Sequence, residues 1–117
     1  MYVVTIVLSV LLAVAFLGAG GTKLAGLAMQ RGNAEHLNIP YVAYRGIGAL
    51  EVAGALGLLI GLAVPALGIA AAIGLVLLMI GAAIAHLRNG DGINAVLPSV
   101  ILFLLAAATL VTRALSS

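Results

Sequence analysis

The hydrophobic pattern of this chain consists of long apolar runs separated by short polar segments. The longest run, 52–85, contains no charged side chain, and Glu51 stands immediately before it. As a single helix this run would reach about 50 Å, well beyond the ~30 Å hydrocarbon core of a bilayer. The run must therefore fold back on itself, and Pro65 marks the predicted turn.

The positions of charged residues, Pro and Gly divide the chain into segments that each have the length of one membrane crossing. Helices are favoured over strands because an open sheet would leave unpaired backbone groups in lipid. The predicted spans are 2–22, 44–64, 66–87 and 92–112. Short connections make successive helices antiparallel. The predicted fold is all-α: one domain, 1–117, that forms an integral membrane, up-down-up-down four-helix transmembrane bundle.

Composition supports the membrane assignment. Hydrophobic residues make up 65 % of the chain and charged residues only 7 %, against about 25 % charged residues in soluble domains. The first run has no basic n-region and is too long for a typical signal peptide, so we expect it to remain as a span. The five Lys and Arg residues are scattered between apolar spans and form no phosphate-binding stripe. The lipid bilayer is the expected partner, and nucleic acid is not.

The polar residues fall almost entirely at one side of the predicted bundle. The segments 23–43 and 88–94 connect the spans on that side, and Arg31-Gly32-Asn33 within the first of them is a turn signal. Four of the five cations lie there, and Arg113 lies on the other side. By the positive-inside rule, we expect these two segments to be cytoplasmic in a multi-pass protein of the cell membrane.

Glu51 is the most informative polar residue. The segment between Glu51 and Pro65 is too short to cross a bilayer, so the helix must start near Tyr44, and Glu51 then lies inside the membrane. Acidic residues at that depth are costly and usually functional. The residues that share its helix face are Tyr44, Gly48, Ala55 and Leu58, whereas the opposite stripe is Val52, Leu56 and Leu59. We therefore expect Glu51 to face a helix contact or an internal cavity.

The candidate ligand-binding residues are Glu51, Lys23, His86, Arg45 and Tyr44. Lys23 and His86 come from neighbouring helices at a similar depth and are the favoured partners of Glu51. Arg45 lies about 120° round the helix from Glu51 and is a poor partner. Structural alternatives remain open: a bundle-locking ion pair for Glu51, a carbonyl-bound imidazole for His86, and interface anchors for Lys23 and Arg45.

The remaining sequence patterns indicate no further catalytic or metal-binding site. Glu35 and His36 are expected to form a solvated loop pair. No two potential ligands have the i,i+3 or i,i+4 spacing of a metal site, so no metal is expected, and no catalytic residue is identified. The Gly57-xxx-Gly61 spacing fits either a homodimer contact or packing within the chain.

Four segments resemble the DoxX-like family of small four-helix membrane proteins. They are GAGGTKL at the end of the first span, HLNIP in the polar segment, GIGALEVAGALGLLIGL around Glu51, and AHLRNGD from Ala85 to Asp91. Members are named after a subunit of an archaeal membrane thiosulfate:quinone oxidoreductase, and bacterial relatives are linked to redox and quinone stress. A distant animal relative is a receptor-assembly chaperone of the endoplasmic reticulum.

The resemblance and the residues together lead to three functional expectations. The first is a role in quinone or redox metabolism, with a small apolar ligand bound in the bundle near Glu51. The chain has no cysteine and no haem or flavin motif. No intrinsic cofactor is therefore expected, and an oxidoreductase activity would need a partner redox protein or a diffusible quinone. The alternatives are a scaffold or assembly chaperone for a larger membrane partner and, third, a small proton-coupled transporter.

Overall fold

The computed structural model describes residues 2–116. All its regular elements are helices: α1 (Tyr2–Ala25), α2 (Ala28–His36), α3 (Tyr41–Ile60), α4 (Pro65–Arg88) and α5 (Ile93–Ser116). Four of these helices, all except α2, are long and apolar enough to cross a membrane. The predicted all-α fold with four membrane-length helices is confirmed.

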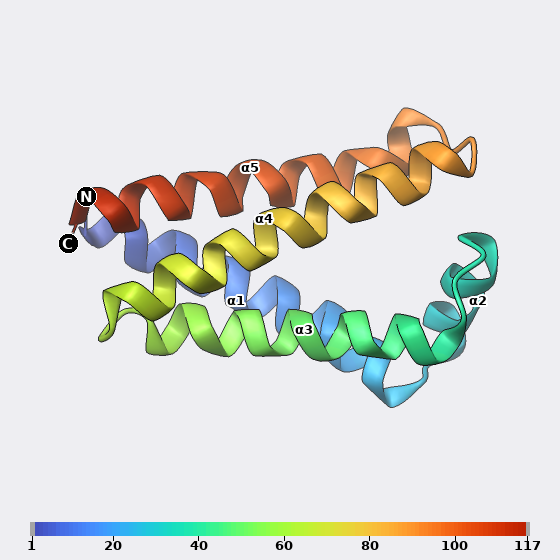
Figure 1. Cartoon of the computed structure of the whole chain (residues 1–117), viewed down its shortest axis with the longest axis horizontal. Helices are drawn as coiled ribbons and strands as arrows, with labels where there is room; N and C mark the ends of the chain where they lie inside the picture. The colour runs from blue at the N-terminus through green and yellow to red at the C-terminus, as the bar shows by residue number, and fades with distance from the viewer. Residues whose placement is uncertain (1, 117) are drawn as a thin grey trace.

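The four long helices form a closed ring in the order α1, α3, α4, α5, each packed against its two neighbours. Successive long helices run in opposite directions, so α1 begins and α5 ends at the same end of the bundle (Figure 1). The opposite end carries α2 and the α4–α5 connection. We call these the termini end and the polar end, respectively.

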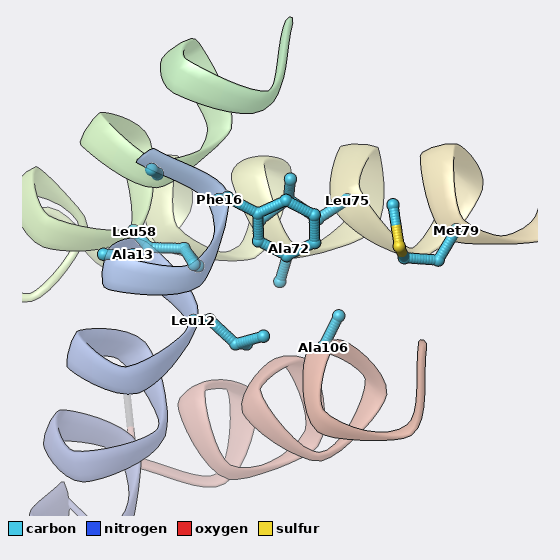
Figure 2. Packing of buried hydrophobic residues seen from close by; sticks show 9 residues of the cluster. Leu12, Ala13, Phe16, Leu58, Ala72, Leu75, Met79 and Ala106 are labelled. Carbon is cyan, nitrogen blue, oxygen red and sulfur yellow. The ribbon is translucent and has the colours of Figure 1, made fainter. Parts of the chain in front are cut away.

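The core lies where the four helices meet. Phe16 of α1 is completely buried, and it lies between the side chains of Leu75 and Leu12 in the cluster of Figure 2. Ala72 of α4 and Ala106 of α5 are also fully buried, and their small side chains let the helices approach this ring. Many larger apolar side chains point outward instead, as expected for helices that face lipid.

The turn at Pro65 is present. Pro65 is the first residue of α4, a position where its missing N–H costs little. It also forces Val64 into an extended conformation, so α3 cannot continue to residue 64 and ends at Ile60, earlier than the predicted 44–64 span. At this turn the backbones of Gly61 and Gly68 touch, because a Cβ atom on Gly68 would lie 3.2 Å from the Gly61 oxygen. The termini end of α3 and α4 is therefore closed.

Arg113 contributes to this closed end. It is only 5 % exposed, and its Nε donates a hydrogen bond to the Gly61 carbonyl at 3.2 Å. Its Nη2 donates to the Leu62 carbonyl at 3.4 Å, and its guanidinium lies 5.5 Å from the centre of the Tyr2 ring. Arg113, which lies in the last turn of α5, thus donates to carbonyl groups that follow the end of α3.

The turn expected at Arg31-Gly32-Asn33 is wrong, because these residues lie inside α2. The chain turns earlier, at Gly26, whose φ of +73° suits glycine. Tertiary hydrogen bonds from Gln30, described below, outweigh the weak helix propensity of Gly32 and Asn33.

The glycines of the Gly57-xxx-Gly61 motif are buried within the chain. Gly57 packs against Ala71, and Gly61 against Gly68. The spacing therefore serves intramolecular packing, and a homodimer remains a prediction that this motif does not support.

Candidate functional site

Lys23 and Glu51 form an ion pair inside the bundle, between α1 and α3. Lys23 Nζ lies 2.8 Å from Glu51 Oε1, and the two side chains are 12 % and 4 % exposed. Oε1 is buried, and its contact with Nζ lacks the geometry of a hydrogen bond. The structure thus pairs Glu51 with Lys23, one of the two partners favoured by the sequence.

The pair depends on a close approach of α1 and α3. A Cβ atom on Gly48 would lie 2.7 Å from Lys23 Cβ and 2.9 Å from the Gly20 carbonyl oxygen, so only glycine leaves room for both. Glu51 lies about 15 Å along α3 from Tyr41, which corresponds to the middle of a ~30 Å hydrocarbon core. The ion pair is therefore an intramembrane feature.

The expected helix face of Glu51 is also present. Tyr44, Gly48, Ala55 and Leu58 are all buried with it. On the opposite stripe, Leu56 and Leu59 are exposed, whereas Val52 is half-buried because it contacts Gly20 of α1.

α2 positions Tyr44 beside this pair. Gln30 is buried, donates a hydrogen bond to Thr22 Oγ1 at 2.8 Å and accepts one from the Tyr44 hydroxyl at 3.1 Å. The Tyr44 ring centre lies 5.2 Å from Lys23 Nζ, within the range of a cation–π contact. α2 thereby packs against the part of α3 that extends beyond the end of α1.

A cavity of about 870 Å³ adjoins the ion pair, and we call it the main cavity. Its walls come mainly from α3 and α4, with smaller contributions from α1 and α5. Along α4 its lining runs from Leu67 to His86, about 28 Å of helix. This placement agrees with Figure 1, where α3 and α4 lie close together at the termini end and diverge toward the polar end.

The lining of the main cavity is apolar except for a few side chains. The polar ones are Lys23, Tyr44, Glu51, His86 and Ser99. Small residues such as Gly74 and Gly81 leave open space along α4, since a Cβ atom on either would meet nothing within 4 Å. The site therefore joins a long apolar channel to a buried charge pair, an arrangement that suits a ligand with a polar head and an apolar body.

His86 lines the main cavity but binds Asp91 instead of Glu51. Its Nδ1 lies 2.7 Å from Asp91 Oδ2, and the other carboxylate oxygen contacts His36 Nε2 at 2.5 Å. The hydrogen bond from His86, followed by that from His36, holds the pKa of the Asp91 carboxyl below its usual value. This His86–Asp91–His36 cluster joins α2 to the α4–α5 connection at the polar end.

The structure thus places four of the five candidates, Lys23, Tyr44, Glu51 and His86, around the main cavity. Arg45 is exposed and does not line it. His36, expected in a solvated pair with Glu35, is bonded to Asp91, whereas Glu35 is exposed. A ligand-binding role for the four residues remains a prediction.

Two residues of the site were missed from the sequence. Asp91 follows His86 by five positions across a helix end, a spacing that no helical periodicity singles out. Gln30 immediately precedes the apparent turn signal and gave no sign of its tertiary hydrogen bonds. Within residues 2–116, no group of three or more His, Asp or Glu side chains is placed to hold a metal ion.

Comparison with known proteins identifies the family of this chain. Neither a curated protein nor a solved structure matches the chain. The model of the DoxX-like family matches residues 7–109, which include all four helices of membrane length in whole or large part and both partners of the ion pair. The chain therefore belongs to the DoxX-like family of membrane proteins.

Proposed function

We propose that this protein binds a membrane-soluble ligand with a polar head and an apolar body, and that the ligand is a quinone. The observation that carries the proposal is the Lys23–Glu51 pair in the wall of a largely apolar cavity of about 870 Å³. A buried ion pair contributes little stability compared with well-packed apolar residues. An intramembrane carboxylate beside a cavity is better explained by a ligand than by stability.

The chemistry of the pair suits both forms of a quinone. The Lys23 ammonium has three N–H donors and only one carboxylate partner, so it has donors available for a quinone carbonyl. The Glu51 carboxylate only accepts hydrogen bonds, and the reduced form of a quinone offers hydroxyl donors. The apolar walls along α3 and α4 would hold the ring substituents and the start of an isoprenoid tail.

A redox role would require a partner. The chain has no cysteine, so it has no thiol with which to transfer electrons itself. Any oxidation or reduction of a bound quinone would therefore involve a separate redox protein that supplies or removes the electrons. The membrane-facing surface and the exposed polar end are both accessible to such a partner.

We further propose that the polar end faces the cytoplasm in the cell membrane. Lys23 and Arg113 are largely enclosed by the bundle, with a 12 % exposed side chain and 5 % exposure respectively, so we do not count them as topology signals. The exposed cations are Arg31, Arg45 and Arg88, and all three belong to the polar end. The positive-inside rule then assigns this end to the cytoplasm more clearly than a count of all cations would.

Quinone titration of the purified protein in lipid nanodiscs tests the binding proposal. The chain has no tryptophan, so tyrosine fluorescence reports on the cavity through Tyr44. We expect decyl-ubiquinone to bind and Glu51→Gln and Lys23→Met each to weaken binding about tenfold, equivalent to about 1.4 kcal/mol. Arg45→Gln is the matched control and is expected to bind normally.

Two outcomes would count against this function. Unchanged affinity in Glu51→Gln would remove the role of the ion pair. Recovery of a stoichiometric membrane protein by crosslinking in native membranes, with no bound small molecule after purification, would favour the scaffold function instead.

A further inference from the structure

A second, smaller cavity lies on the aqueous side of the site. It has a volume of about 110 Å³ and is lined by Asn33, His36, Leu37, Tyr44 and His86. Leu37, Tyr44 and His86 line both this cavity and the main cavity, so these three residues form the wall between the two. Its lining is mostly polar and its volume holds several water molecules, since one water needs roughly 10–15 Å³.

The carboxylate of Asp91 defines the hydrogen-bonding state of His86. A carboxylate only accepts hydrogen bonds, so His86 Nδ1, at 2.7 Å, must carry the proton that it donates to Asp91. In a neutral imidazole the other nitrogen, Nε2, is then an acceptor. Within the described residues, Nε2 of His86 makes no hydrogen bond to protein. It is therefore available to a ligand in the main cavity or to water in the smaller one.

The cluster around His86 is built to hold it in place. The Asp91 side chain is 8 % exposed and that of His86 25 %, whereas the second imidazole, of His36, is 58 % exposed. The central carboxylate is thus the least exposed member of the cluster, and His36 is the most exposed. The chain contains no histidine besides these two.

We propose that His86 is the proton-exchange residue of the ligand site, with Asp91 as its positioning residue and the small cavity as its path to water. This inference rests on the proposed binding of a quinone-type ligand. When the ligand presents a hydroxyl group, its O–H bond breaks as Nε2 of His86 takes the proton. The proton then passes from Nε2 to water in the small cavity, and the imidazole returns to its neutral form. No electrons move in this step.

The other ionisable groups around His86 leave it the residue best placed for this exchange. Glu51 already faces the ammonium of Lys23, and Oε1 is sealed from water. The Tyr44 hydroxyl is engaged with Gln30. Asp91 and His36 contact each other and reach the main cavity only through His86, since neither lines it.

NMR of the full chain with ¹⁵N-labelled histidine tests this inference in nanodiscs. Only two imidazoles contribute, and His36→Gln assigns them. In the neutral imidazole form we expect His86 to carry its proton on Nδ1, which faces Asp91. In Asp91→Asn we expect the form protonated on Nε2 to appear. A neutral His86 protonated on Nε2 in the wild-type protein would overturn the inference.

Addition of reduced decyl-ubiquinone provides the second arm. We expect the His86 Nε2 resonance to shift and that of His36 to shift far less, with tyrosine fluorescence reporting binding in the same sample. Binding without a His86 response would overturn this inference and leave the proposed function intact. Absence of binding would overturn the proposed function and this inference with it. In Asp91→Asn we expect binding to persist while the Nε2 response is lost.

Discussion

The two ends of this bundle differ in what surrounds a buried charge. At the termini end, Arg113 donates to the carbonyls of Gly61 and Leu62, and the adjoining helices meet backbone to backbone. Towards the polar end, Glu51 faces a large cavity, and Lys23 is its one charged partner among residues 2–116. The first charge completes a packed helix end, whereas the second is left beside space that the protein does not fill.

This contrast separates structural from functional charge in one small membrane protein. Burial alone does not distinguish them, because Arg113 and Glu51 are 5 % and 3 % exposed. What distinguishes them is the surroundings: carbonyl groups that need donors around Arg113, and an open apolar cavity beside Glu51. Substitutions around Arg113 should therefore lower stability, and substitutions around the main cavity should weaken ligand binding.

The largest effect on stability is expected from Arg113→Met. The substitution keeps an apolar stem but removes the guanidinium donor to the Gly61 carbonyl, whereas the Leu62 carbonyl keeps the hydrogen bond from the Tyr2 hydroxyl at 3.0 Å. We expect a cost of about 1–3 kcal/mol. Thermal unfolding in detergent measures the loss, and Arg88→Met, at an exposed position, is the control. Quinone affinity should remain unchanged. A large loss of affinity with normal stability would show that the two ends are not separate.

The largest effect on binding is expected from filling the main cavity. Gly81 lines it, and an added Cβ there would meet no atom within 4 Å, so we expect the side chain of Gly81→Leu to occupy ligand space. We expect at least a tenfold weaker affinity for decyl-ubiquinone, about 1.4 kcal/mol, in the fluorescence titration. Gly18→Leu is the matched control, because Gly18 is equally open but lies outside the cavity. Equal affinities in the two variants would mean that the ligand does not use this cavity.

A smaller effect, dependent on pH, is expected from Asp91→Asn. The pKa of Asp91 is lower in the folded chain than its unfolded value of about 3.9, because His86 and His36 bind the carboxylate. Its contribution to stability is therefore complete above that value and is lost as pH falls through the folded pKa. We expect a lower unfolding temperature for the variant at neutral pH and convergence with the wild-type protein in acid. A constant difference across this range would contradict the account.

The smallest effect is expected from Arg45→Gln. Arg45 is exposed and does not line either cavity. Unfolding temperature and quinone affinity should both match the wild-type values, within about 0.5 kcal/mol in stability. A clear loss of quinone affinity would show that Arg45 belongs to the binding site and that the ligand extends beyond the main cavity.

The sequence predicted the features that follow from local pattern and length. Apolar runs predicted the helices, and Pro65 predicted the turn. Helical phase together with depth predicted the face of Glu51 and two possible partners, of which Lys23 pairs with it and His86 does not. What it missed depends on tertiary geometry. α2 exists because Gln30 binds Thr22 and Tyr44, although Gly32 and Asn33 locally favour a turn.

The cavity could not be predicted for a related reason. Its size depends on how far α3 and α4 diverge, and that divergence is set by side-chain packing among four helices instead of any single segment. In the sequence Arg113 simply follows the predicted span 92–112, and only the fold brings it to the end of α3.

Photoaffinity labelling with an azido-quinone is the most direct test of the central claim, that a ligand head lies at the Lys23–Glu51 pair. The labelled protein is digested, and the modified residues are mapped by mass spectrometry with and without excess unlabelled quinone. The account predicts competable labelling of residues around the polar part of the main cavity, such as Tyr44 and His86, and its loss in Gly81→Leu. Labelling that is unaffected by competitor and confined to the outward-facing apolar residues or to the termini end would contradict it.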